Sequence, residues 1–541
     1  MSRVVAVSNR VSIPRRGAAP GGLAVGVLAA MQARGGLWFG WSGQVGARDD
    51  DVPEIVTRNG ISFATIDLEQ QEFTRFLNGF SNGALWPTFH YFLETVNFSD
   101  EDYAGYLAVN RRFAATLKPL LRDDDLLWVH DFHLIPLARA LRDLGMPQPA
   151  AFFLHVPFPH VEALRVLPVY GELVNAMLTY DVLGFQTQTD VESFRSAVLQ
   201  LHGPEALLPD GSVRAGERRV VLDAYPIGVD VDAIQREALD SQGGDEVRRM
   251  VAGLLGRKLM IGVDRLDYSK GLVNRFQAYE RFLESQPENL GRITYLQVAP
   301  LSRTDLRAYS RLRRELEQTA GRINGRFAET DWTPIRYLNR NFAHEALMGF
   351  FRAAQVGLVT PVRDGMNLVA KEFVAAQDAE DPGVLILSSL AGAARELSGA
   401  LLVNPHDTRG MALAIQVALS MPLAERLERH AANLAVLRRN DIAAWHTRML
   451  AALVATRAAA APPRAEPTAP AGAPPSVVPV EQRQESATER RARLRGLAPT
   501  ARAAHAPAPP GRGLGLGTPP AGPATEREPG GPGRLAPVPL R

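Results

Sequence analysis

The sequence predicts an α/β protein of two domains, each built around a parallel β-sheet of the Rossmann type. Three observations support this prediction. The 541 residues are 46% hydrophobic, which is enough for more than one core, because single domains usually stop growing near about 250 to 300 residues. Short apolar runs alternate with helical stretches, the pattern typical of βα units. The composition changes abruptly after residue 456, where the folded part is expected to end.

The expected strands fall into two series. The first series comprises Val4 to Val7, Leu126 to Val129, Ala151 to Leu154 and Val182 to Phe185. The second comprises Lys258 to Val263, Ile293 to Val298, Val356 to Val359 and Val384 to Leu387. Tyr225 to Val229 lies between them and is expected to be a crossover. We therefore expect an N-terminal domain over residues 1–230 and a C-terminal domain over 231–456, facing each other across a cleft, with a final helix that crosses back.

The segment 457–541 is expected to be a disordered tail. It holds 18 of the 39 prolines and no Phe, Trp or Tyr, so it has too little apolar surface to offset the entropy of ordering. Its 12 arginines and 6 glutamates give a charge of +6, whereas the other 456 residues carry 48 basic and 52 acidic groups, a net charge of −4. An arginine-rich interaction arm is the alternative for the tail. The folded part gives no electrostatic case for nucleic-acid binding.

Cysteine usage and hydropathy bear on the compartment. The sequence has no cysteine, which excludes disulfides, thiolate metal ligands and cysteine nucleophiles and suits a reducing compartment. It contains no run of about 18 apolar residues, so no membrane span is expected. Arg15 and Arg16 before the apolar stretch Leu23 to Met31 imitate a signal peptide, but a strand at Val4 to Val7 argues against one. We therefore expect a cytoplasmic protein.

Chemistry is expected at strand ends, because ligands of open parallel sheets bind beyond the carboxyl ends of the strands. Arg10 follows the first strand, and Gly22 opens an apolar helix whose free N–H groups suit an anion; ordinary turn glycines are the alternative. Asp131 stands between two histidines after the second strand, and His155 follows the third, where a satisfied core histidine is the alternative. Nothing supplies the three or four converging ligands of a metal site, so no metal is expected.

One acidic run is assigned to a turn. Asp123 to Asp125 imitates the Asp-x-Asp motif of metal-dependent sugar transferases, but the run precedes a strand and so lies at the wrong end of the sheet for a ligand. We expect a solvated turn there.

In the second half, cations follow two strands. Arg265 and Lys270 share one loop and Arg303 ends another, an arrangement suited to a pyrophosphate leaving group, with solvated loop charges as the alternative. The stretch from Thr360 to Phe373 is the most specific. A strand there runs through a glycine loop into a helix, which places Asp364 to meet sugar hydroxyls and Glu372 one turn into the helix to accept two ribose hydroxyls.

With these residues in view, the chain resembles glycosyltransferase family 20, the trehalose-6-phosphate synthases, a retaining and metal-independent family of the GT-B fold. The resemblance runs from Arg3 to about Trp445. It is carried by Val7 to Arg10, Gly36 to Gly43, Phe80 to Asn82, Trp86-Pro87, His130 to His133, Arg265 to Gly271 and Arg363 to Leu368. It implies a hexosyltransferase without a cofactor that joins glucose from a nucleotide-glucose to glucose 6-phosphate. UDP-glucose is the expected donor, but nothing in the sequence fixes the base, so GDP-glucose and ADP-glucose stay open.

The resemblance also implies roles for single residues. The acceptor phosphate would be held by Arg10 and Arg303, and the acceptor sugar by Asp131 and Trp86. The donor would be held by Gly22, His155, Arg265, Lys270, Phe342, Asp364, Leu368, Val369 and Glu372, with Arg265 and Lys270 on the pyrophosphate, His155 and Asp364 on the glucose, and Glu372 on the ribose. The expected catalytic residues are Asp131, His155, Arg265, Lys270 and Asp364. The resemblance implies retention of configuration by front-face attack, and no residue is an evident nucleophile.

One residue departs from the family pattern, because Leu77 stands where the family usually has a tyrosine that touches the acceptor phosphate. A related transferase acting on glycerol phosphate or a cyclitol phosphate is therefore an alternative, and an inactive sugar-phosphate sensor is a remote one.

A dehydrogenase is disfavoured because neither half has GxGxxG at its first βα turn. A fused phosphatase is disfavoured because no Asp-x-Asp-Gly follows Trp445. The expected partners are small-molecule substrates, with no nucleic acid and no membrane, and a homo-oligomer is an open alternative to a monomer.

Overall fold

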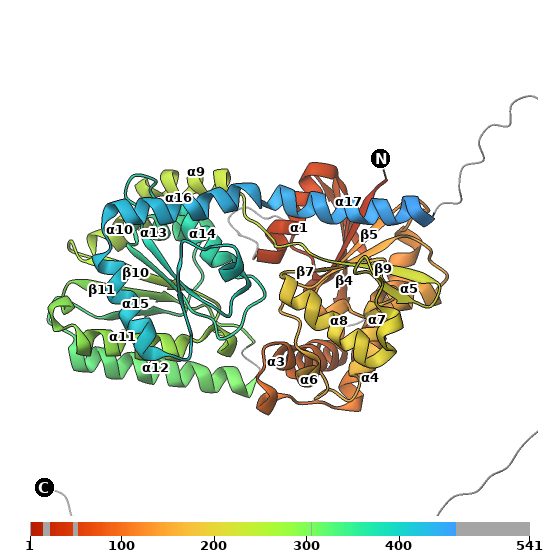
Figure 1. Ribbon diagram of the computed structural model, residues 1–541, viewed down its shortest axis with the longest axis horizontal. Coiled ribbons are helices and arrows are strands. Elements are labelled where there is room, and N and C mark those ends of the chain that lie inside the picture. The colour runs from red at the N-terminus through yellow and green to blue at the C-terminus, as the bar shows by residue number, and fades with distance from the viewer. Residues whose placement is uncertain (1, 14–21, 47–51, 304–305, 461–541) are drawn as a thin grey trace, which may run out of the picture. The chain divides into compact units, whose positions relative to one another are not determined.

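The computed structural model describes residues 2–13, 22–46, 52–303 and 306–460. Its first half contains a nine-stranded sheet in the order β3-β4-β2-β1-β5-β6-β7-β9-β8 (Figure 1). The strands are β1 (Val4–Arg10), β2 (Gly36–Val45), β3 (Glu54–Arg58), β4 (Ile61–Leu68), β5 (Leu126–His130), β6 (Ala150–Phe153), β7 (Val182–Phe185), β8 (Val213–Ala215) and β9 (Arg218–Ala224). All neighbours pair in parallel except β3 with β4 and β8 with β9, so antiparallel pairs close the two edges.

Helices cover this sheet. They are α1 (Gly22–Arg34), α2 (Gln70–Glu72), α3 (Trp86–Phe89), α4 (Asp100–Leu117), α5 (Leu137–Asp143), α6 (Val161–Leu164), α7 (Tyr170–Met177) and α8 (Gln188–His202), with a π-helical segment η1 (Phe73–Leu85) between α2 and α3. Side-chain caps fix helix starts: Ser99 accepts a hydrogen bond from the Asp102 amide before α4, and Thr187 and Asp190 form a capping box on α8.

The second half contains a six-stranded, wholly parallel sheet in the order β12-β11-β10-β13-β14-β15. Its strands are β10 (Lys258–Val263), β11 (Ile293–Val298), β12 (Ile335–Leu338), β13 (Val356–Val359), β14 (Val384–Ser388) and β15 (Leu401–Val403). Its helices are α9 (Val231–Asp240), α10 (Asp245–Ala252), α11 (Leu272–Ser285), α12 (Arg307–Phe327), α13 (His344–Ala353), α14 (Leu368–Ala376), α15 (Thr408–Ser420) and α16 (Leu423–Arg439).

Both faces of each sheet are buried at the central parallel strands, whereas the edge strand β3 is largely exposed. In β1, Val5 and Val7 belong to one apolar core and Val4 and Ala6 to another, because successive side chains point to opposite faces. That second core contains residues of both sheets, whereas a third core covers the other face of the second sheet. The expected α/β architecture of two parallel-sheet domains is confirmed, and all eight expected strands are present.

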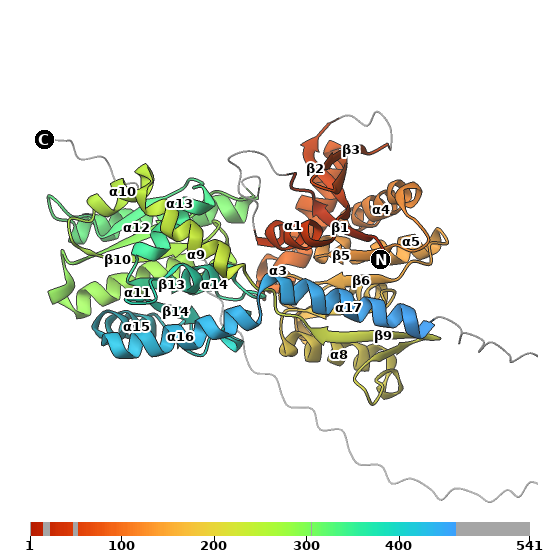
Figure 2. The same ribbon diagram turned by 90° about the horizontal axis from the view of Figure 1, so that it is seen from above.

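The last helix, α17 (Ile442–Ala460), returns to the first half of the chain, where it contacts α1, β6 and β7 (Figures 1 and 2). Its Trp445 is fully buried, with ring centroids 4.9 Å from Trp128 and 5.2 Å from Phe153. The expected tail lies outside the described residues from position 461 onward, and so do Arg15 and Arg16.

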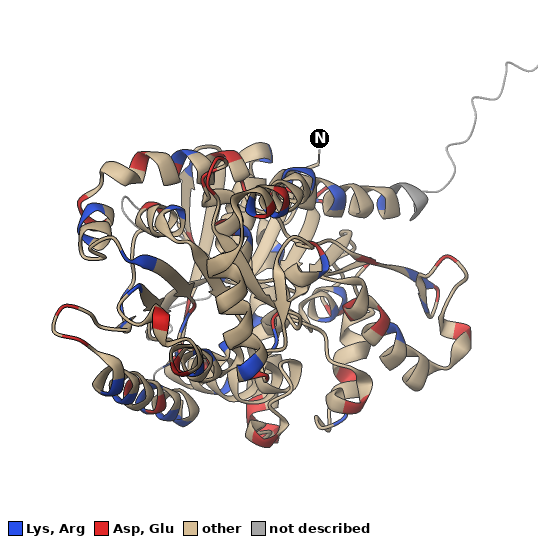
Figure 3. Cartoon of the chain, turned by 60° about the vertical axis from the view of Figure 1, so that its left-hand side comes forward, with Lys and Arg blue, Asp and Glu red and all other residues tan. Residues whose placement is uncertain are grey.

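Charges of both signs are interspersed over the described elements (Figure 3). The solvated turn expected at Asp123 to Asp125 is wrong for its last residue. Asp125 is fully buried, and it accepts hydrogen bonds from the Arg3 guanidinium at 2.6 Å and from the Arg122 amide at 2.8 Å. A carboxylate can be buried when it is paired in this way. None of the described helices is long and apolar enough to cross a membrane.

Candidate functional site

The carboxyl ends of neighbouring strands in the first sheet bring Asp131 and His155 together. Asp131 follows β5 with a φ of 76°, and its amide donates to the carbonyl of Phe153 at 2.8 Å. The amide of His155, just beyond β6, donates to Asp131 Oδ1 at 3.2 Å. The left-handed backbone at a non-glycine residue is therefore held by bonds on both sides, and it aims the carboxylate at the end of the sheet.

The two groups are held in different charge states. Burial raises the pKa of Asp131 to about 6, although two amide hydrogen bonds and the charges of Arg303 and Arg265 oppose the rise. Burial lowers the pKa of His155 to about 3. Near neutral pH the site thus holds a partly buried carboxylate beside a neutral imidazole.

His130, at the end of β5, is the partner of that imidazole. Its Nδ1 lies 3.2 Å from His155 Nε2, and burial holds the pKa of His130 well below its usual range. One neutral ring therefore donates to the other through these two nitrogens. The other ring nitrogen of His155, Nδ1, is then the one left for a ligand.

Trp86, the first residue of α3, joins the two halves of the chain. The Arg303 guanidinium lies over its ring at 3.9 Å from the centroid, and that of Arg265 at 5.7 Å. His90 stacks on the same indole at 4.0 Å. Trp86 Nε1 is buried and has no hydrogen-bond partner in the described part of the chain. The structure thus brings Trp86, Arg265 and Arg303 together, around an indole N–H that is buried and unsatisfied within the described residues.

Arg303 is held in place from its own half of the chain. It has a φ of 49° and donates to the Tyr309 hydroxyl at 2.6 Å, which in turn donates to Asp267 Oδ2 at 2.8 Å. Asp267 is fully buried; burial alone would raise its pKa, but Arg303 and Arg265 hold the pKa below its usual value. This network pre-orders a cation at the strand end.

Lys270 and Asp364 form an ion pair of 2.5 Å between the loops that follow β10 and β13. Burial alone would raise the pKa of Asp364, but the Lys270 ammonium, together with His90 and a hydrogen bond from Asn367, keeps it below its ordinary value. Gly365 packs against the other half, since a Cβ there would lie 2.3 Å from the His155 carbonyl oxygen. This close approach explains the glycine beside Asp364.

The amino end of α14 carries the expected nucleotide site. Asn367, at a φ of 79°, caps the helix by accepting a hydrogen bond from the Ala370 amide at 3.1 Å, and Leu368 and Val369 are half-buried in the first turn. Glu372 lies 3.8 Å from His344 Nε2, and His344 Nδ1 lies 2.6 Å from Glu237. Burial lowers the pKa of His344, but the two carboxylates outweigh this effect and raise it to about 9.

Three expected residues lie apart from these contacts. Arg10, exposed at the end of β1, lies 5.9 Å from the ring centroid of Trp41. Gly22 begins α1. Phe342 precedes α13, where it packs edge-on against Phe350 and under the Arg340 guanidinium at 4.2 Å.

The sequence reading missed several residues that order the site: His90, Asp267, Tyr309, His344 and Asn367. A signal existed for two of them. His90 lies four residues after Trp86, a helical spacing, and Asn367 lies where an N-cap is expected before an apolar helix. Tyr309 and His344 reach the site only through tertiary contacts.

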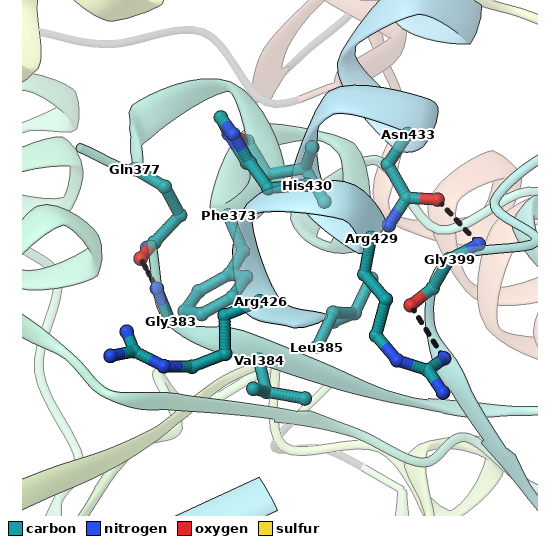
Figure 4. Close-up of a pocket in the computed structure, with 11 residues that line it drawn as sticks. Phe373, Gln377, Gly383, Val384, Leu385, Gly399, Arg426, Arg429, His430 and Asn433 are labelled. Atoms are coloured by element: carbon teal, nitrogen blue, oxygen red, sulfur yellow. Dashed lines mark hydrogen bonds between the residues drawn. The ribbon is translucent and has the colours of Figure 1, made fainter. Parts of the chain in front are cut away.

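A small pocket lies beside α14, between it and α16 (Figure 4). His430 Nε2 lies 3.1 Å from the Val374 carbonyl oxygen, and the Gln377 side chain accepts from the Gly383 amide at 2.7 Å. Its volume of about 10 Å³ suits one water molecule, not a nucleotide sugar. The pocket therefore belongs to the support of α14.

Two parallel-sheet domains with fixed cations, carboxylates and a helix amino end at their strand termini define a glycosyltransferase of the GT-B type. The family model for glycosyltransferase family 20 matches residues 10–455, and the chain belongs to this family.

Relatives with known names agree. Trehalose-6-phosphate synthase of Klebsiella pneumoniae subsp. pneumoniae is 48% identical over 452 residues, which are 83% of this chain and 94% of that protein. The α,α-trehalose 6-phosphate synthase structure from Burkholderia multivorans is 51% identical with a TM-score of 0.82, covering 85% of this chain and 98% of that one. A UDP-forming α,α-trehalose-phosphate synthase from Burkholderia xenovorans in complex with glucose 6-phosphate is 47% identical with a TM-score of 0.80, covering 84% and 100%.

Proposed function

We propose that this chain transfers glucose from UDP-glucose to glucose 6-phosphate with retention, giving α,α-trehalose 6-phosphate and UDP. The observation that carries the proposal is the assembly around Trp86, where Arg303 and Arg265 from the other half of the chain lie over the indole ring. Such a site holds two cations in fixed positions for a phosphate, with the indole ring packed against them. The UDP-forming relative that is in complex with glucose 6-phosphate supports both substrates.

The donor is assigned to the C-terminal domain, residues 231–456. Arg265 and Lys270 would bind the pyrophosphate, with Gly22 of the first half against it, and His155 and Asp364 would orient the glucose. Phe342, Leu368 and Val369 would line the nucleotide, and Glu372 would accept the ribose hydroxyls. In the structure Lys270 is paired with Asp364, so a bound pyrophosphate would share the Lys270 charge with that carboxylate.

The acceptor is assigned to the N-terminal domain, residues 1–230, together with Arg303. Arg10 and Arg303 would bind the acceptor phosphate, and Trp86 and Asp131 the acceptor sugar. Asp131 is suited to hold a sugar hydroxyl, because its desolvated carboxylate gains from accepting a hydrogen bond. Leu77, half-buried on η1, offers the phosphate no hydroxyl.

The reaction follows from charge placement. The bond from the glucose anomeric carbon to the β-phosphate oxygen breaks as the acceptor hydroxyl oxygen attacks from the same face. Its proton passes to the departing phosphate oxygen, so no enzyme base is consumed. Arg265 and Lys270 stabilise the negative charge that develops on UDP, which we take as the main catalytic effect. The expected location is the cytoplasm.

A matrix of nucleotide-glucose donors against phosphorylated acceptors tests this proposal. UDP-, GDP- and ADP-glucose would each be offered with glucose 6-phosphate, glycerol phosphate and a cyclitol phosphate, while nucleoside diphosphate release and product configuration are measured. UDP release with glucose 6-phosphate and an α,α-linked product is expected. Release only with another acceptor would overturn the acceptor assignment, and binding of both substrates without product would indicate a sensor.

A further inference from the structure

Lys371 is a fully buried cation on α14, next to Glu372 in the expected nucleotide site. Its Nζ donates to Glu396 Oε2 at 2.5 Å and to the Ile227 carbonyl oxygen at 2.7 Å. The Glu396 side chain is only 10% exposed, so both charges are largely removed from water.

Glu396 connects this cation to the loop that carries Asp364. It directly follows the short helical segment η9 (Gly392–Arg395). At the start of η9 the Gly392 amide donates to the Asp364 carbonyl oxygen at 3.1 Å, and the Ala393 amide donates to that of Met366 at 2.8 Å. The Lys371–Glu396 pair therefore ties the first turns of α14 to the segment that supports Asp364.

The Lys371–Glu396 pair also contacts the two segments that link the halves of the chain, which we call the two passages. Ile227 lies in the first passage, between β9 and α9, and Asn440 lies in the second, between α16 and α17. Asn440 Nδ2 donates to Glu396 Oε1 at 2.8 Å. The passages touch, because a Cβ at Gly228 would lie 2.1 Å from the Asn440 carbonyl oxygen. Lys371 and Glu396 thus bridge α14, the Asp364 loop and both passages.

A buried ion pair is a poor source of stability, since apolar residues of similar size often serve as well or better. Its distinctive property is fixed geometry, because each charge tolerates few positions once it is desolvated. We propose that Lys371 is a positioning residue for the donor site, which with Glu396 holds the amino end of α14 and the Asp364 loop in register with the two passages. This inference rests on the proposed function, in which α14 binds the donor nucleotide.

The inference separates donor binding from acceptor binding. Loss of the pair would free α14 and the Asp364 loop, whereas the hydrogen bond of Asp131 and the stacking of Arg303 on Trp86 do not involve Lys371 or Glu396. The affinity for UDP is expected to fall, whereas the KM for glucose 6-phosphate is expected to stay within about twofold of the wild-type value.

Two measurements test this inference: UDP affinity by calorimetry without acceptor, and thermal unfolding. They would be made on the wild type, on Lys371→Met, on Lys371→Met combined with Glu396→Leu, and on the control Arg3→Met. The control breaks another ion pair with a buried carboxylate, Arg3–Asp125, at the amino end of the first sheet. Lys371→Met is expected to weaken UDP binding about tenfold and to lower the melting temperature. The double variant should regain part of the stability but keep the weak UDP binding, while Arg3→Met should lose stability only.

Wild-type UDP affinity in Lys371→Met, or its full return in the double variant, would overturn the inference, and so would equal weakening by Arg3→Met. If Lys371→Met does not fold, the double variant and Asn440→Ala, which removes a single bond to Glu396, carry the same comparison. A wild-type protein that binds UDP but transfers no glucose to glucose 6-phosphate would refute the proposed function, while the UDP affinities would still decide the role of Lys371.

Discussion

Arg303 lies over the Trp86 indole at 3.9 Å from the ring centroid, although the two residues belong to different halves of the chain. The Arg303 side chain is only 13% exposed, and its guanidinium is held by Tyr309. Its plane, and not its charge alone, is therefore part of the acceptor site that we propose.

Arg303→Lys keeps the charge but loses the planar stacking. We expect the KM for glucose 6-phosphate to rise about tenfold with a smaller change in the KM for UDP-glucose, because a lysine neither stacks nor donates in a fork. Steady-state kinetics with each substrate varied in turn measures this. Arg313→Lys, at an exposed pair on α12, is the matched control and should behave as wild type. Equal rises in both KM values would contradict an acceptor role.

Lys270→Ala removes the cation paired with Asp364. We expect kcat at saturating substrates to fall by about 100-fold or more, because a fixed charge that stabilises the leaving pyrophosphate acts mainly in the transition state. Initial rates of UDP release would show this. An unchanged kcat with a raised donor KM would assign Lys270 to ground-state binding instead.

Asp131→Asn tests a conflict between stability and activity. The pKa of Asp131 is raised from 3.8 to about 6 in the folded protein, so folding favours the protonated form, and the ionised carboxylate costs stability above pH 6. The variant should be more stable than wild type at pH 8, by about 1 to 3 kcal/mol, and nearly equal at pH 4, yet turn over much more slowly. Denaturant unfolding of the variant and the wild type at pH 4 and pH 8 measures this difference. Equal stability of the two proteins at both pH values would contradict a raised pKa of Asp131.

His344→Gln should change stability with the opposite pH dependence. The folded pKa of about 9 lies above the ordinary value of 6.5, so the contribution of His344 is fully present below pH 6.5 and is lost as the pH rises through 9. We expect the variant to lose about 1 to 3 kcal/mol of unfolding free energy at pH 6 and little at pH 9.5. A loss independent of pH would show that packing, not the ion pairs with Glu237 and Glu372, accounts for the effect.

Leu77→Tyr restores the hydroxyl that the family pattern usually has. If glucose 6-phosphate is the acceptor, its KM should fall about tenfold or more, because a hydrogen bond to a charged phosphate contributes about 1.5 kcal/mol or more. Leu77→Phe is the control, since it adds the ring without the hydroxyl. A lower KM in both variants would trace the effect to packing.

The sequence predicted the buried strands well because continuous apolar runs mark strands covered on both faces, as in β5, β10 and β14. It did not identify β2, whose glycines weaken the strand pattern, nor β3, β4, β8, β9, β12 and β15. Pairing with neighbours, rather than local preference, makes these segments strands.

Site residues at strand ends were within reach of the sequence, because strand direction alone places Asp131, His155 and Asp364 at the carboxyl edges. The network behind them was not. Lys371 reads as a polar residue of an amphipathic helix, and only the packing of α14 against Ile227 and Glu396 makes it a buried cation.

The return of α17 to the first half determines where the chain can be cut into two fragments. Trp445 completes an aromatic cluster with Trp128, Phe153 and His155, so a fragment of residues 1–230 would lack one wall of its own core and would expose that cluster to water. A fragment that begins at residue 231 would carry α17 as an orphan apolar helix, prone to association. Reassembly from two pieces should therefore work best when residues 442–460 are supplied together with the N-terminal piece.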